Sequence, residues 1–138
     1  MKDMELACTA DPAEVGKLRA AAGQWLHRHG VGQQDCMDIV LVVSELATNA
    51  VQASNAGAPI TLRMQIVDGS VTVTVRDHGS GFEINGIDHM ADPDAPRGRG
   101  LPIVAAMTDA LDATHRDGIT EVRVVRRLNR DRTPPRGG

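Results

Sequence analysis

Residues 38–53 read DIVLVVSELATNAVQA, and this stretch predicts a helix of about four turns that is apolar on almost every side. A helix of that kind is typical of the interior of a domain. Glu45 and Asn49 interrupt it, and because they are four residues apart, their side chains lie on one narrow stripe. A carboxylate among apolar side chains is costly unless a partner compensates it. The stripe therefore lines a polar pocket or forms a solvated edge of the helix, and this stretch alone favours neither interpretation.

The composition argues against several classes of function. A net charge of −3 offers no basic surface for a nucleic acid, and Trp25 and Phe82 are too few aromatic residues for stacking on single-stranded bases. Cys8 and Cys36 lie far apart without metal-ligand spacing, which argues against a structural zinc site. The sequence has no continuous apolar run of transmembrane length and no apolar signal-peptide core. We therefore expect a cytoplasmic protein that binds neither membranes nor nucleic acids.

Capping signals give the limits of two helices. Asp11-Pro12-Ala13-Glu14 predicts a helix start, in which Asp11 caps the free amides and Glu14 completes a capping box. Apolar residues recur at helical spacing from there to about His29. The central helix is expected to begin near Gln34 and to end at Asn55-Ala56-Gly57. Residues 4–9 are expected to form a short edge strand.

The spacing of the apolar residues then changes to every second position, which predicts a β-hairpin. Asp68-Gly69 is a strong hairpin-turn signal, and it places residues 61–66 opposite residues 71–76. Apolar residues then fall opposite one another: Leu62 pairs with Val75, Met64 with Val73 and Ile66 with Val71. The same phase puts Asp77 on the core-facing side, where a carboxylate needs a specific partner. The alternative is that the strand ends at Arg76 and that Asp77 belongs to a turn.

Residues 78–100 are rich in Gly and Pro and lack periodicity, so they predict a long loop of the kind that forms lids. Phe82, Ile84 and Ile87 are available to anchor a short helix within it. A further helix is predicted from Leu101 to about Asp109. The segment Gly98-Arg99-Gly100 before this helix would offer free amides to a phosphate group, although glycines here are also consistent with a simple turn.

The chain closes with a second predicted hairpin around Asp117-Gly118. Its register pairs Leu111 with Val124, Ala113 with Val122 and His115 with Thr120, which puts Thr120 on the core face. We expect one domain over residues 1–128 and a disordered basic tail over residues 129–138.

Three of these motifs together resemble the GHKL ATPases, the family of histidine kinases, type II topoisomerase ATPase domains and their relatives. Glu45-Leu46-Ala47-Thr48-Asn49-Ala50 is similar to the family's N box. Asp77-His78-Gly79-Ser80-Gly81-Phe82 resembles its first glycine box, and Gly98-Arg99-Gly100-Leu101 resembles its second. Within the family the chain is most similar to the small anti-sigma-factor serine/threonine kinases of bacteria, although Ala53 stands where that branch often has His.

The resemblance implies an α/β (α+β) two-layer sandwich, with a mixed, mainly antiparallel sheet covered on one face by helices that enclose an ATP site. It assigns Asn49 as a ligand of Mg²⁺, Glu45 as the general base and Asp77 as the acceptor of the adenine amino group. The other nucleotide-binding residues that it implies are Gly79, Gly81, Gly98, Arg99, Gly100, Leu101 and Thr120. Residues 82–97 would form the ATP lid.

The implied function is that of an ATP-binding anti-sigma-factor-type regulator. Such a protein would phosphorylate a serine of an antagonist protein, and it would capture or release a sigma factor accordingly. Members of the branch commonly form homodimers. The alternative is a nucleotide-dependent protein-binding module with little or no kinase activity.

Overall fold

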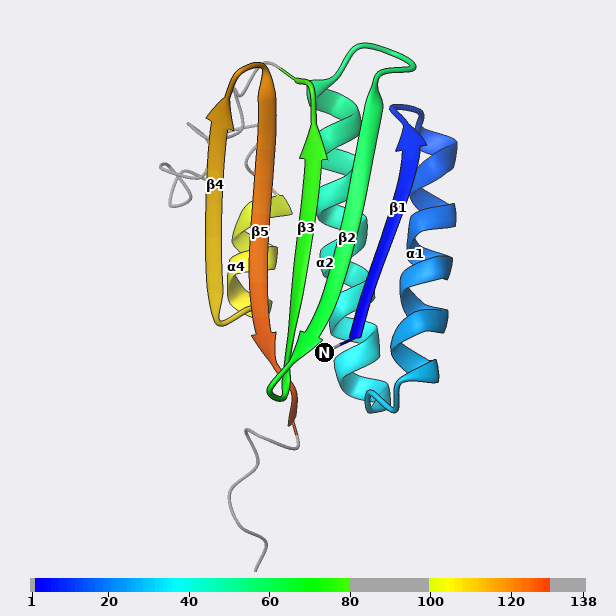
Figure 1. Ribbon diagram of the computed structural model, residues 1–138, viewed down its shortest axis with the longest axis vertical. Helices are drawn as coiled ribbons and strands as arrows, with labels where there is room; N and C mark the ends of the chain where they lie inside the picture. The colour runs from blue at the N-terminus through cyan, green and yellow to red at the C-terminus, as the bar shows by residue number, and fades with distance from the viewer. Residues whose placement is uncertain (1, 80–99, 130–138) are drawn as a thin grey trace, which may run out of the picture.

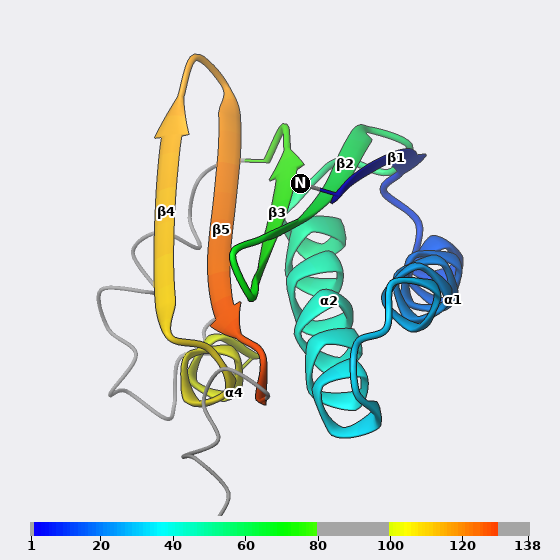
Figure 2. The same cartoon turned by 60° about the horizontal axis from the view of Figure 1, so that its bottom comes forward.

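One antiparallel sheet with helices on a single face makes up the computed structural model, which describes residues 2–79 and 100–129 (Figure 1). The strands are β1 (Lys2–Thr9), β2 (Pro59–Val67), β3 (Ser70–Asp77), β4 (Ala110–Arg116) and β5 (Ile119–Arg127). The helices are α1 (Pro12–Arg28), α2 (Gln33–Ala53) and α4 (Gly100–Met107). All three lie on the same side of the sheet (Figure 2). The expected two-layer sandwich is confirmed.

The strands lie in the order β1-β2-β3-β5-β4, and each neighbouring pair among them is antiparallel. The sheet is therefore antiparallel throughout the described ranges, where a mixed, mainly antiparallel sheet was expected. Both hairpins have the predicted register, with Leu62 opposite Val75 and Leu111 opposite Val124. Their turns carry positive φ angles at Asp68 and Asp117 and at the glycine that follows each, as Asp-Gly hairpin turns require.

The start of α1 differs in one detail from its predicted capping box. Asp11 is the N-cap, and its Oδ1 accepts a hydrogen bond of 2.9 Å from the amide of Ala13. The Glu14 carboxylate, however, lies 2.9 Å from Lys17 Nζ one turn further on. An acidic side chain in the first turn interacts favourably with the helix dipole whichever partner it has. Here the partner of Glu14 is the ammonium group of Lys17, and not the N-cap backbone amide that a capping box would use.

The core lies between the sheet and α2, whose buried residues include Ile39, Val43, Leu46 and Ala50. By length and composition alone, α2 could also cross a membrane. The same properties are those of a core helix in a globular domain, and α2 packs against α1, α4 and β3.

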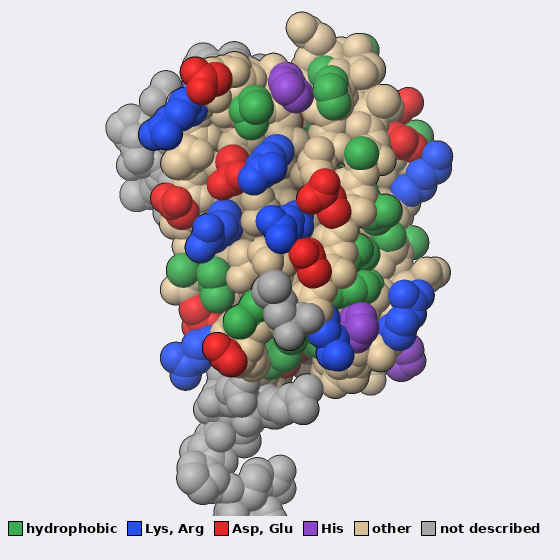
Figure 3. All heavy atoms as spheres, in the orientation of Figure 1, with side chains coloured by type: hydrophobic (Ala, Val, Ile, Leu, Met, Phe, Trp, Pro, Cys, Tyr) green, Lys and Arg blue, Asp and Glu red, His purple; other side chains and the backbone are tan. Residues whose placement is uncertain are grey.

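The other face of the sheet is open and carries cations and anions intermingled (Figure 3). Cross-strand ion pairs join Arg63 to Asp3 at 3.0 Å and Arg76 to Glu121 at 2.6 Å. The hydrogen bonds from Arg63 lower the pKa of the Asp3 carboxyl. Because these groups remain exposed, solvent screens them, and they contribute little to stability.

A buried ion cluster closes the core at the end of the sheet where β5 stops. Arg126 is 6% exposed, and its Nη2 lies 2.8 Å from Asp35 Oδ1 and 2.7 Å from Asp38 Oδ2. Its Nη1 donates a hydrogen bond of 2.9 Å to the carbonyl oxygen of Met107, the last residue of α4. Asp35 Oδ2 accepts a hydrogen bond of 2.6 Å from the amide of Asn129. The first residue of the predicted disordered tail is therefore bound to α2, and residues 130–138 lie outside the described residues.

We predict that Arg126→Met lowers the free energy of unfolding by about 3–5 kcal/mol, because it leaves two carboxylates and a carbonyl oxygen without their cation. Urea unfolding monitored by circular dichroism measures the change. Arg63→Met is the matched control, since it removes the same side chain from an exposed pair and should leave the midpoint nearly unchanged. Equal small effects of both substitutions would contradict a stabilising role for the cluster.

Candidate functional site

A row of five residues crosses the helix-facing side of the sheet at the end where β3 stops. In the order of the strands it consists of Cys8, Ile60, Asp77, Thr120 and His115. The two rows before it are apolar in every strand: Leu6, Leu62, Val75, Val122 and Ala113, then Met4, Met64, Val73, Val124 and Leu111. The last row therefore changes from apolar to polar on β3, β5 and β4.

Asp77 and Thr120 are the buried members of this polar segment, at 4% and 2% exposed. Asp77 is the last residue of β3, so the alternative that it belongs to a turn is wrong. Its phase along the strand directs the carboxylate to the core side, as predicted. The Oδ1 atom accepts a hydrogen bond of 2.6 Å from the amide of Gly79.

Glu45 and Asn49 are half-buried on the C-terminal half of α2, one turn apart. The Nδ2 atom of Asn49 is buried, and nothing within the described part of the chain hydrogen-bonds to it. The same is true of Ser54 Oγ at the C-cap of the same helix. An unsatisfied buried polar group costs about 1–3 kcal/mol, so the Nδ2 donor of Asn49 and the hydroxyl of Ser54 are both candidate contacts for a ligand.

Gly79 brings the end of β3 against the end of α2. A Cβ atom at this position would lie 2.7 Å from the carbonyl oxygen of Ala53 and 2.8 Å from its Cβ. It would also lie 2.7 Å from Asp77 Oδ1. Glycine is required here by close approach, and this contact places the carboxylate of Asp77 at the same end of α2 as Asn49.

Helix α4 begins at Gly100, and its C-terminal end is tied to the N-terminal end of α2 by Arg126. The two helices therefore run in opposite directions, and the N-terminus of α4 faces the half of α2 that carries Glu45 and Asn49 (Figure 1). Gly81, Gly98, Arg99 and the predicted lid over residues 82–97 lie outside the described residues. For Gly100 and Leu101 only the helical backbone is described.

Sequence reasoning placed His115 opposite Thr120 but gave it no role. The structure adds a side-chain contact, because His115 Nδ1 lies 2.8 Å from Thr120 Oγ1. The register was the available signal: an imidazole directly opposite a core-facing threonine at the polar end of the sheet is within reach of its hydroxyl.

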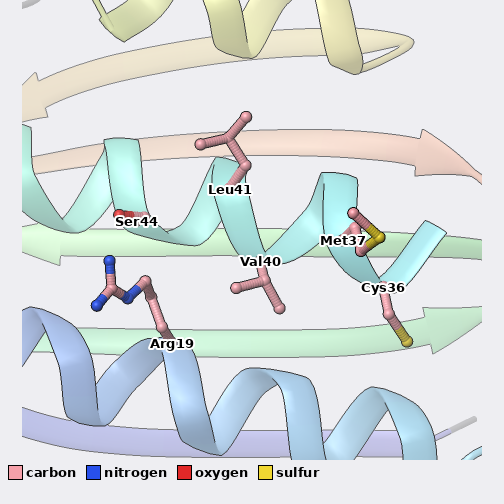
Figure 4. Close-up of a pocket in the computed structure, with 6 residues that line it drawn as sticks. All are labelled: Arg19, Cys36, Met37, Val40, Leu41 and Ser44. Carbon is pink, nitrogen blue, oxygen red and sulfur yellow. The ribbon is translucent and has the colours of Figure 1, made fainter. Parts of the chain in front are cut away.

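A separate cavity of about 510 Å³ lies between α1 and α2, on the side of these helices that faces away from the sheet (Figure 4). Its lining residues are Arg19, Cys36, Met37, Val40, Leu41 and Ser44. It contains none of the residues singled out by the motifs, and its walls are mainly apolar. It is therefore separate from the candidate site.

We predict that Gly79→Ala lowers the free energy of unfolding by about 1–3 kcal/mol, because the new methyl group must separate β3 from the backbone of α2. The measurement is a denaturant unfolding curve. Gly16→Ala in α1 is the control. Its Cβ would meet only Arg19 Nη2 at 3.7 Å, and alanine stabilises a helix relative to glycine, so this variant should be as stable as the wild type or more stable by up to about 1 kcal/mol. A Gly79→Ala protein as stable as the wild type would show that the approach is not tight.

A family model described as the histidine kinase-like ATPase domain matches residues 8–126. The serine-protein kinase RsbW of Bacillus licheniformis is 27% identical to this chain, over 94% of the chain and 88% of that relative. The RsbW protein of Bacillus subtilis is 25% identical with the same coverage.

Solved structures agree on the fold. The structure of the RsbU and RsbW domains of a Mycobacterium tuberculosis protein matches with a TM-score of 0.70 at 23% identity, over 93% of this chain and 33% of that one. The SiaB–SiaC complex of Pseudomonas aeruginosa gives a TM-score of 0.64 at 17% identity, over 89% of this chain and 88% of the matched one. The resemblance inferred from the three motifs is confirmed, and the chain belongs to the histidine kinase-like ATPase domain family.

Proposed function

We propose that this protein is an ATP-dependent serine/threonine protein kinase of the anti-sigma-factor type. The family implies the use of ATP, and the Bacillus relatives that align with 94% of the chain are serine-protein kinases. The observation that carries the proposal is that the end of β3 with Asp77 packs through Gly79 against Ala53, at the end of α2 that also carries Asn49. A buried acceptor carboxylate fits the amino group of a polar base, whereas the Nδ2 donor of Asn49 and the N-terminus of α4 fit an anionic end of the ligand.

Asp77 is proposed to bind the adenine amino group. A buried carboxylate at the end of an apolar row is an acceptor, and the exocyclic amino group of adenine is a donor of matching polarity. Thr120 lies beside it on β5 and supports the same side of the base. Gly79 and Gly81 would let the backbone approach the nucleotide closely.

Asn49 is proposed as a ligand of Mg²⁺. The described residues contain no cluster of three or more His, Cys, Asp or Glu side chains that could hold a metal ion by themselves. Mg²⁺ is bound in such sites through few protein oxygens, with phosphate oxygens and waters completing its shell, so an amide one turn from a carboxylate fits it. When bound, the ion would neutralise negative charge on the phosphates. Asn49 would bind the ion through Oδ1. Its Nδ2 group is a donor without a hydrogen-bond partner among the described residues, so it is available to a phosphate oxygen beside the ion.

Glu45 is proposed as the general base. It lies one turn before Asn49, about 6 Å along the helix axis, and so borders the phosphate end of the site. Its carboxylate would accept the proton of the attacking serine hydroxyl. Gly98, Arg99, Gly100 and Leu101, where α4 begins, would hold the phosphates through backbone amides and the positive end of the helix dipole.

The partners that we propose are an antagonist protein with an accessible serine and a sigma factor. The relatives are serine-protein kinases by name, and the two partners and a homodimer are what the resemblance to the anti-sigma-factor kinases implies. We place the protein in the cytoplasm, where ATP is available and thiols stay reduced. Cys8 and Cys36 are free, and burial raises the pKa of both thiols, which keeps them little ionised at neutral pH.

Asp77→Asn tests adenine recognition. We expect it to weaken ATP binding by about 5- to 150-fold, the equivalent of about 1–3 kcal/mol for leaving a buried polar group without its hydrogen-bond partner. Equilibrium dialysis with labelled ATP measures the affinity. Asp68→Asn makes the same change in a hairpin turn with positive φ, which asparagine tolerates, and should bind ATP as the wild type does. Unchanged affinity of the Asp77→Asn protein would remove the basis of the site.

Glu45→Gln tests the chemistry. With γ-labelled ATP and antagonist proteins encoded nearby, the wild type should label a serine, and the variant should transfer label at least about 100-fold more slowly while its ATP affinity stays within about twofold. Glu5→Gln on the exposed β1 is the matched control and should transfer normally. If the wild type labels no antagonist while ATP still alters partner binding, the protein is a nucleotide-dependent binding module.

A further inference from the structure

We propose that His115 is a positioning residue that makes the site selective for adenine over guanine, by fixing the hydroxyl of Thr120 as a hydrogen-bond donor. The inference rests on the proposed function, because it takes the polar row of the sheet as the wall beside the nucleobase. Among the described residues, the side-chain hydrogen bond of His115 to that wall is the one to Thr120. Its effect on a ligand therefore has to pass through the threonine.

The geometry restricts Thr120 closely. The residue is 2% exposed and lies on β5 between Asp77 of β3 on one side and His115 of β4 on the other. His115 Nδ1 is 2.8 Å from Thr120 Oγ1, within the range of a good hydrogen bond. One side of the hydroxyl is thereby occupied, and the neighbour of Thr120 on the other side of the row is Asp77.

A threonine hydroxyl has a single proton and two lone pairs, so the role that it plays toward His115 decides the role left for the base. In the proposed arrangement the Nδ1–H group of His115 donates to Oγ1. The hydroxyl proton then points away from the imidazole. Thr120 becomes a donor beside Asp77, which is an acceptor when ionised.

An acceptor next to a donor matches the edge of adenine, whose amino group donates and whose N1 accepts. Guanine presents the opposite pattern there, because its O6 accepts and its N1–H donates. A site whose polar groups are fixed rejects the reversed pattern, since each mismatched buried group loses its partner. His115 therefore acts on specificity by holding one proton in one direction.

Equilibrium dialysis of ATP and GTP against variants of the full chain tests this. His115→Phe keeps a ring of similar size without nitrogen and should weaken ATP binding about 3- to 10-fold, with no change for GTP, so that the preference for ATP narrows. His115→Asn places an N–H near the position of Nδ1 and should restore ATP affinity to within about twofold of the wild type. His27→Phe on the exposed end of α1 is the matched control and should change neither affinity.

Thr120→Val separates positioning from packing. In that background His115→Phe should have no further effect on ATP affinity, because the group through which it acts is gone. The proposal is overturned if His115→Phe leaves ATP binding unchanged, or if it weakens ATP and GTP equally in both backgrounds. Asp77→Asn in the same assay distinguishes a failure of this inference from a failure of the proposed function. If Asp77→Asn weakens ATP binding and His115→Phe does not, only the role of His115 is refuted. Unchanged binding with both variants refutes the proposed function as well.

Discussion

The register of β3 against β2 and β5 is the constraint on which the rest of the molecule depends. Side chains alternate between the two faces of a strand, so a slip of one residue would move Asp77 from the core to the open face and expose every valine of β3. The Asp-Gly turn and the paired apolar residues prevent that slip. Burial of the apolar rows, which stabilises the sheet, therefore also holds one carboxylate at the end of the core.

The two ends of the helix-facing layer treat their polar groups differently. At one end Arg126 binds Asp35, Asp38 and the carbonyl oxygen of Met107, so buried charges satisfy one another and join α2, α4 and β5. At the other end Asn49 keeps a buried amide without a partner in the described structure. The first arrangement is complete without a ligand, whereas the second leaves a donor unsatisfied among the described residues. We therefore regard the Arg126 cluster, whose polar groups are all paired, as structural, and the end with the unpaired amide of Asn49 as the candidate binding site.

Local patterns were sufficient to predict the strands, both hairpin registers and the inward phase of Asp77, because turn chemistry and alternation act between near neighbours. The Arg126–Asp35 contact joins residues 91 apart in the chain. It depends on how α2 packs on the sheet, so no local sequence pattern predicts it. The same holds for the Ala53–Gly79 approach. For Glu14 the capping rule named the right residue, but a nearby lysine competed successfully for its carboxylate.

The central claim is that Asp77, Thr120 and the Glu45/Asn49 stripe form the walls of one nucleotide site. A crystal structure of the protein with Mg²⁺ and a non-hydrolysable ATP analogue tests it most directly. The account predicts the adenine amino group against the Asp77 carboxylate and the metal ion on the side-chain oxygen of Asn49. A nucleotide bound elsewhere, for example in the cavity between α1 and α2, with Asp77 and Asn49 making no contact to it, would contradict the account.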